Sequence, residues 1–62
     1  MKITKAIKKA VDTRNSEMAG RIADVLRFKW EMNYDEIYNK VNSIAPISKP
    51  MWEAMMYESE SN

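Results

Sequence analysis

The sequence has no cysteine, no histidine, one glycine and only two prolines among its 62 residues. Without cysteine there is no disulfide framework of the kind that holds small secreted domains together, and no zinc finger or thiol chemistry. Without histidine the chain lacks the commonest metal ligand and the commonest general base. The scarcity of glycine and proline excludes collagen-like and linker-like chains. We therefore expect a folded protein that is not an enzyme and that uses no cofactor or metal.

Long apolar runs are absent as well. No stretch approaches the ~20 apolar residues that a membrane span requires. The lysine-rich first nine residues lack the continuous apolar region of a secretory signal. We therefore expect a cytoplasmic protein with no membrane partner. A chain of this length buries only about 60% of the surface that its unfolded form exposes, so we expect one domain with a marginal core.

The small net charge of +1 conceals a strong asymmetry along the chain. Residues 1–29 contain eight Lys and Arg against three Asp and Glu, a net charge of +5. Residues 30–62 contain two against six, a net charge of −4. Such asymmetry directs a basic face toward nucleic acid or an acidic protein surface. The alternative is that the two halves neutralise each other within the fold.

Hydrophobic periodicity predicts two helices in the first half of the chain, over residues 3–12 and 16–31. The polar residues between them favour turns and caps, so we expect a break, although one long helix over 3–31 is the alternative. The second helix has a wide apolar stripe, which predicts a central position. Gly20 within it costs about 1 kcal/mol relative to Ala, so we expect a close helix crossing there.

Two further helices are predicted in the second half. Asn33 and Glu36 have the spacing of a capping box at the start of a third helix. This helix ends before Pro46, because the residue preceding a proline is pushed out of the α region. Ser48 and Pro50 begin a fourth helix, since proline is tolerated in a first turn.

These elements predict an all-α fold, a bundle of three main helices plus a short C-terminal fourth. We expect a single helical domain over residues 1–58 and a frayed acidic tail over 59–62. The predicted core consists of the large apolar residues of the four helices: Ile7, Val11, Ile22, Val25, Leu26, Trp30, Ile37, Val41 and Trp52.

Residues 25–57 contain the runs Val25-Leu26-Arg27, Tyr34-Asp35-Glu36-Ile37 and Ile47-Ser48 in this order. This segment, a little over half of the chain, resembles the helix-turn-helix of region 4 of bacterial sigma factors and related regulators. The resemblance implies a transcription regulator whose last helix enters the major groove of DNA. The start of that helix departs from the family, because Lys49 is its only cation and Glu53 would face phosphate.

Two groups of residues are candidate binding sites. Four methionine and aromatic residues near the C-terminus are typical of protein interfaces, or else they close the core; they are Trp52, Met55, Met56 and Tyr57. Both alternatives hold if Trp52 is buried while Met56 and Tyr57 stay exposed. The basic face of the first helix is a candidate nucleic-acid-binding site, or else an ordinary solvated surface; its residues are Lys5, Lys8, Lys9 and Arg14.

We expect this chain to be a non-enzymatic protein-binding module, because the segment that should read bases has the wrong charge. In size and style it is similar to the accessory proteins that bacteriophages encode to modulate or inhibit a host or nucleic-acid-processing protein. The alternative is a small helix-turn-helix-like DNA-binding transcriptional regulator that uses its basic N-terminal helix, with a homodimer as the expected assembly.

Overall fold

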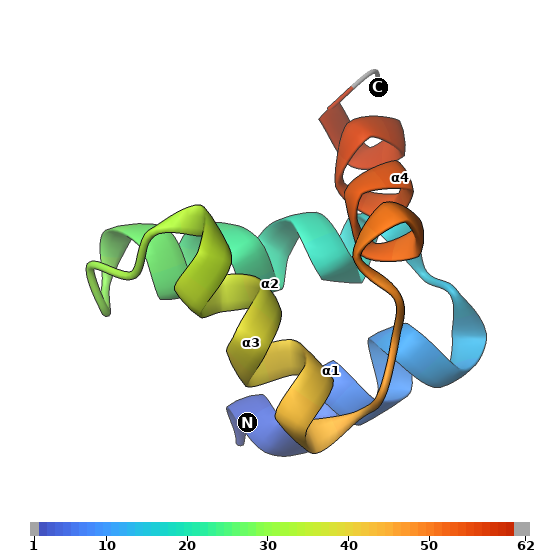
Figure 1. Ribbon diagram of the computed structural model, residues 1–62, viewed down its shortest axis with the longest axis horizontal. Coiled ribbons are helices and arrows are strands. Elements are labelled where there is room, and N and C mark those ends of the chain that lie inside the picture. The colour runs from blue at the N-terminus through green and yellow to red at the C-terminus, as the bar shows by residue number, and fades with distance from the viewer. Residues whose placement is uncertain (1, 61–62) are drawn as a thin grey trace.

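Four helices make up most of residues 2–60, which are the residues that the computed structural model describes, residue 60 by its backbone alone. They are α1 (Ile3–Thr13), α2 (Ser16–Phe28), α3 (Tyr34–Ile44) and α4 (Lys49–Glu60) (Figure 1). Within this part of the chain no strand occurs, so the predicted all-α class is confirmed. At 12 residues α4 is as long as the other helices, and the expectation of a short fourth helix is wrong.

The break between α1 and α2 is confirmed, and the single long helix is excluded. Arg14 adopts the left-handed conformation with φ of 53°. The N–H of Asn15 donates to the carbonyl of Ala10 at 3.0 Å, the pattern that closes a Schellman-type helix end. The Asn15 side chain then caps α2 by accepting the N–H of Met18 at 3.1 Å.

The end of α2 lies at Phe28, three residues before its predicted end. Glu31 is left-handed with φ of 54°, and the N–H of Met32 donates to the carbonyl of Leu26 at 3.0 Å. This tight turn takes Trp30 out of the helical phase. Its side chain is 53% exposed, and its ring lies 5.2 Å from the Lys40 ammonium rather than in the predicted core.

The capping box of α3 is confirmed. The Asn33 side chain accepts the N–H of Glu36 at 2.9 Å, and the Glu36 carboxylate accepts the N–H of Asn33 at 3.0 Å. Beyond the other end of α3, the Tyr38 hydroxyl donates to the Ile47 carbonyl at 2.7 Å. The Ile47 N–H donates to the Asn42 side chain at 3.0 Å. These two bonds hold the short connection to α4 against α3.

The fourth helix begins as predicted, with the Ser48 hydroxyl accepting the N–H of Met51 at 3.4 Å. It continues to Glu60, so residues 59 and 60 of the predicted tail are helical. Residues 61 and 62 lie outside the described residues.

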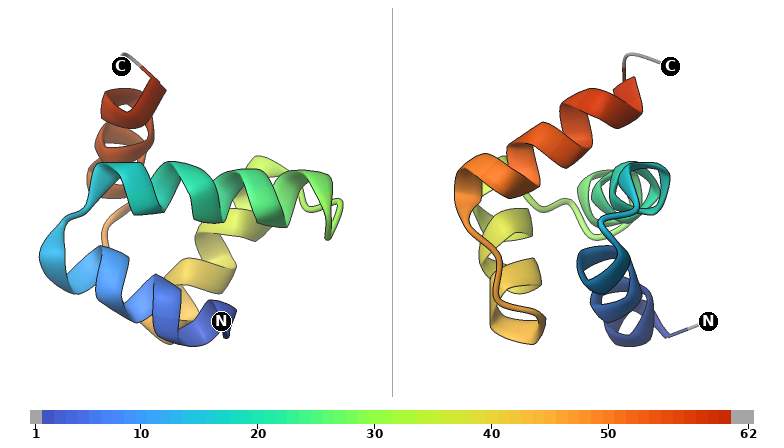
Figure 2. Two further views of the ribbon diagram at one scale, coloured as in Figure 1. Left: turned by 180° about the vertical axis from the view of Figure 1, so that it is seen from behind. Right: turned by 90° about the vertical axis from the view of Figure 1, so that its right-hand side faces the viewer.

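The second helix occupies the middle of the molecule and packs against the other three helices, in keeping with its wide apolar stripe. α1 and α4 lie on opposite sides of it (Figures 1 and 2). The predicted crossing at Gly20 is confirmed, because a Cβ there would lie 2.8 Å from the Cβ of Ser59 in α4. The space that a side chain at position 20 would need is therefore taken by Ser59.

Seven of the nine predicted core residues are buried, and Trp30 and Val25 are not. Val25 is 41% exposed because it lies about a quarter-turn round α2 from Leu26, which faces the core. Alanines, two residues of the α3–α4 connection and a methionine of α4 take the remaining core positions: Ala6, Ala10, Ala19, Ala45, Ile47 and Met55.

Candidate functional site

A groove of about 760 Å³ opens between the C-terminal half of α2, the first turns of α3 and the middle of α4. We call it the α2–α4 groove. Its floor is apolar and comes from all three helices and the turn before α3: Ala23, Met32, Ile37 and Met56. Its rim is polar and aromatic: Asp24, Arg27, Asn33, Tyr34, Glu53 and Tyr57.

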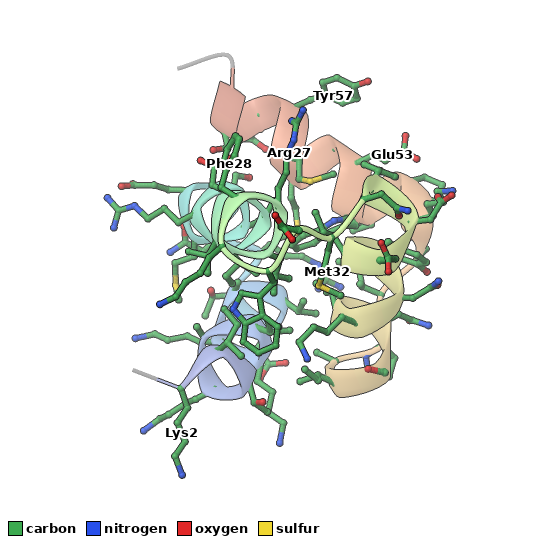
Figure 3. The ribbon with its side chains drawn as sticks, turned by 90° about the vertical axis from the view of Figure 1, so that its left-hand side faces the viewer. Lys2, Arg27, Phe28, Met32, Glu53 and Tyr57 are labelled. Carbon is green, nitrogen blue, oxygen red and sulfur yellow. The ribbon has the colours of Figure 1, made fainter. Side chains whose placement is uncertain are left out.

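Local structure explains how the floor is assembled. Ile37 is a buried residue one turn into α3, and the capping box fixes where that turn begins. The tight turn after α2 brings Met32 back over Leu26, so that its side chain points between the helices (Figure 3). Met56 follows buried Met55 on α4 and is half-buried itself. The floor therefore contains two flexible methionine side chains, Met32 and Met56, beside residues that are held in place by core packing.

Tyr34 and Glu53 link the two sides of the rim. The Tyr34 hydroxyl hydrogen-bonds to the Glu53 carboxylate of α4. Partial burial, this hydrogen bond and the negative charges of Glu53 and Asp35 together raise the pKa of Tyr34 to about 12, with burial the largest cause. The phenol therefore stays protonated at neutral pH and remains a donor to Glu53.

Lys49 contacts Tyr34 and its neighbour Asp35 from the outside. Its ammonium lies 3.3 Å from the Asp35 carboxylate and 5.6 Å from the centre of the Tyr34 ring. A cation near an aromatic face at this distance is attracted to it. The only cation in the first turn of α4 is thereby engaged with α3.

An aromatic and cationic cluster lies at the outer edge of the groove, where Arg27 and Tyr57 line the groove and Phe28 adjoins Arg27. Phe28 is 73% exposed and Tyr57 is 68% exposed, although both are large aromatic residues. The Arg27 guanidinium lies 5.4 Å from the centre of the Phe28 ring, and in Figure 3 the Arg27 side chain extends from α2 toward Tyr57 of α4. Tyr, Phe, Met and Arg are the residues that are enriched at protein interfaces.

The four predicted protein-binding residues divide between core and groove. Trp52 and Met55 are buried and lie on the inner face of α4, where a partner cannot reach them. Met56 is part of the groove floor and Tyr57 of its rim.

Three residues that line the groove, and Phe28 beside them, were not predicted from the sequence as binding residues; the three are Arg27, Tyr34 and Glu53. A usable signal was that Phe28 falls outside the apolar stripe of α2, since a large aromatic side chain away from the stripe is left to solvent or to a partner.

The predicted nucleic-acid-binding residues do not form one surface. Lys5, Lys8 and Lys9 are exposed on the outer face of α1. Arg14 is exposed too, but its guanidinium donates to the carbonyl of Val11 at the C-terminal end of the helix. Exposed Lys2 extends the lysine face, and Figure 3 shows it at the opposite end of the molecule from Tyr57.

Salt bridges among the described residues stay within one half of the sequence or the other. They are Arg21–Glu17 at 2.8 Å and Lys49–Asp35 at 3.3 Å. The first lies within the basic half and the second within the acidic half. The charge asymmetry of the sequence therefore persists on the surface of the folded chain.

Other kinds of site are not found in the part of the chain that the structure describes. Residues 2–60 contain no group of three or more Asp and Glu side chains placed to hold a metal ion. None of the four helices has the length and apolar character needed to cross a bilayer. The sequence matches no protein-family model, and no curated protein and no solved structure is similar to it at a significant level.

Proposed function

We propose that this protein is a non-enzymatic binding module that holds a segment of a partner protein in the α2–α4 groove and thereby modulates or inhibits that partner. The single observation behind the proposal is the groove itself: an apolar floor with two methionines beneath a lip of exposed aromatic residues and arginine. Such residues supply most of the energy of protein interfaces when they are centred on a pocket.

The charges on the rim favour one kind of occupant. Asp24 and Glu53 supply two carboxylates against the one guanidinium of Arg27. A cationic side chain that enters beside the floor therefore meets net negative charge, whereas an anionic one is repelled. The occupant that fits is an amphipathic segment with one large apolar anchor and a neighbouring Lys or Arg.

A partner with a basic surface is consistent with the wider charge distribution. The half of the sequence that supplies α3 and α4 has a net charge of −4. Proteins that process nucleic acids expose basic, amphipathic surfaces for their substrate. We therefore place a host or nucleic-acid-processing protein first among the partners, in the manner of a phage-type accessory protein.

The helix-turn-helix resemblance supplies a second candidate, a regulator that reads bases with α4. Three observations speak against α4 in that role. Its Trp52 and Met55 are buried, its first-turn Lys49 is held by Asp35 and Tyr34, and Glu53 faces the groove. We therefore do not assign base reading to α4.

Peptide display tests the groove while its natural partner is still unidentified. Peptides of about 16 residues, long enough for four helical turns, are selected against the immobilised protein and counter-selected against the Met56→Asp variant. We expect the enriched peptides to share an apolar anchor next to Lys or Arg. In NMR spectra of the isotope-labelled protein, binding of these peptides should change the backbone amide chemical shifts most at Met32, Tyr34 and Tyr57.

The matched control is Met51→Asp, the same substitution on the same helix at an exposed position outside the groove. We expect Met51→Asp to bind the selected peptides as the wild type does, while Met56→Asp loses at least tenfold in affinity, or about 1.4 kcal/mol. Equal binding by Met56→Asp and wild type contradicts the proposal. Self-association that Met56→Asp abolishes would instead assign the groove to a second copy of the chain.

A further inference from the structure

We propose that the outer face of α1 binds the phosphate backbone of duplex DNA without reading its bases. This surface lies at the other end of the molecule from the α2–α4 groove, and the inference does not rest on the proposed function. It starts from four exposed lysines, one at the N-cap of α1 and three on its outer side: Lys2, Lys5, Lys8 and Lys9.

The lysines point outward because the opposite side of α1 is in the core. Ala6, Ile7, Ala10 and Val11 are all buried. None of the four lysines takes part in a salt bridge among the side chains that the structure describes, those of residues 2–59. Asp12 is the one carboxylate on the same side of the helix, and it lies in the last turn. Most of the positive charge on this face is therefore not neutralised within the fold and is available to a bound anion.

The spacing of the lysines suits a dense polyanion. Lys2 and Lys9 are seven residues apart, or about 10 Å along a helix. Duplex DNA has one negative charge per ~1.7 Å of its axis, so about six phosphates fall within that length. Each phosphate that a lysine neutralises releases condensed counterions, which favours binding.

The face lacks what other partners need. A protein interface has an apolar centre, but the other exposed residues beside the lysines are polar: Thr4, Asp12 and Thr13. A helix that binds a lipid surface inserts its apolar side, and the apolar side of α1 is already buried in the core. The planar groups that read bases in a fixed bidentate geometry belong to Arg, Asn and Gln, which the face does not contain, whereas the lysine ammonium is a flexible point charge that suits phosphate. Contact with the phosphate backbone alone is the chemistry that remains.

The test is an anisotropy titration of a labelled duplex of about 20 base pairs and arbitrary sequence, at roughly 50 mM and 200 mM salt. We expect wild-type binding to weaken steeply with salt and to be insensitive to the DNA sequence. The slope of log K against log salt concentration is negative, and each phosphate contact contributes about −0.9 to it. The double variant Lys5→Gln/Lys9→Gln loses two contacts, so its slope should be less negative by about 1.8.

The matched control is Arg21→Gln/Lys29→Gln, which removes the same charge from exposed positions at α2 and its C-cap. We expect its salt slope to equal that of the wild type, and thermal unfolding should show both double variants folded. Three results overturn the proposal: no binding at the lower salt concentration, an equal reduction of the slope by the control, or binding to anionic phosphatidylserine vesicles in place of DNA.

Discussion

The two tryptophans show how residues of one type take different roles here. Trp52 is fully buried, and its indole N–H has no acceptor among the described residues. An unpaired buried donor costs about 1–3 kcal/mol, which the burial of a large ring offsets. Trp30 is half exposed, with the Lys40 ammonium over its ring. Residue type alone therefore does not separate core from surface in this chain.

Tyr34 gives a pH dependence that belongs to a single residue. Its pKa rises from an ordinary 10.0 to about 12 in the folded protein. Between these values the unfolded chain releases the proton while the folded chain keeps it, so the free energy of unfolding falls as pH rises. The stabilisation of the folded state by protonated Tyr34 is fully present below the ordinary pKa of 10.0 and is lost as pH rises through about 12. We expect urea unfolding to show that the stability of the wild type relative to Tyr34→Phe decreases across this window.

A tyrosinate absorbance titration provides the direct check. The wild type should show a step near pH 12 that Tyr34→Phe lacks. Glu53→Gln should move this step down, because it removes the charge that faces the phenol while leaving its burial in place. If the difference between wild type and Tyr34→Phe lay near the ordinary value of 10.0 instead, the rim geometry described above would be contradicted.

At the scale of elements, the crossing of α2 and α4 positions both sides of the groove. α4 passes close to Gly20 of α2, where a Cβ would lie 2.0 Å from the Ser59 Oγ and 2.8 Å from the Ser59 Cβ. The hydroxyl can rotate away, but the Cβ of Ser59 moves only if α4 moves. The absence of a side chain at position 20 therefore sets the distance between the helices.

Gly20→Ala should destabilise the protein although alanine is the better helix former. Overpacking costs about 1–3 kcal/mol and outweighs the propensity gain of about 1 kcal/mol, so we expect a net loss of about 1 kcal/mol in the free energy of unfolding. Urea unfolding measures this loss. In a Ser59→Gly background the clash is absent, and the same substitution should become stabilising. Stabilisation of the Ser59-containing protein by Gly20→Ala would contradict the close crossing.

The whole molecule has two distinct ends. Lys2 of the lysine face lies at one end, and Glu53 and Tyr57 of the groove rim lie at the other (Figure 3). α2 separates them and packs against both α1 and α4. If both proposals hold, the protein can contact DNA and a protein segment at the same time.

This arrangement predicts that the two binding events are independent. A saturating DNA duplex should change the affinity of a selected groove peptide by less than about twofold, because the two sites share no residue. Calorimetric titration of the peptide with and without DNA measures this. A tenfold loss, or about 1.4 kcal/mol of coupling, would show that the surfaces overlap or compete.

Most of the fold could be predicted from the sequence because its signals are local. The Asn33–Glu36 capping box acts over three residues, and Pro46 acts on the residue before it. The end of α2 was missed because the turn at Glu31 uses a left-handed residue that is not glycine, which has no sequence signature. That miss put Trp30 in the predicted core.

The candidate site was predictable only in part, since Met56 and Tyr57 were identified while Phe28, Arg27 and Glu53 were not. Periodicity specifies which side of a helix is apolar, but it does not specify which neighbour covers that side. The groove depends on three helices that meet, and no single helix carries that information.

The sequence by itself determined the all-α class, the starts of the helices, the break before Asn15 and the +5/−4 division of charge. These depend on backbone preferences, caps and composition. The tertiary structure decided that Trp52 and Met55 close the core, that Met32 and Met56 share one groove floor, and that the lysines of α1 lie away from the groove. Those features depend on the angles at which four helices cross, and these angles are fixed by packing between residues far apart in the chain.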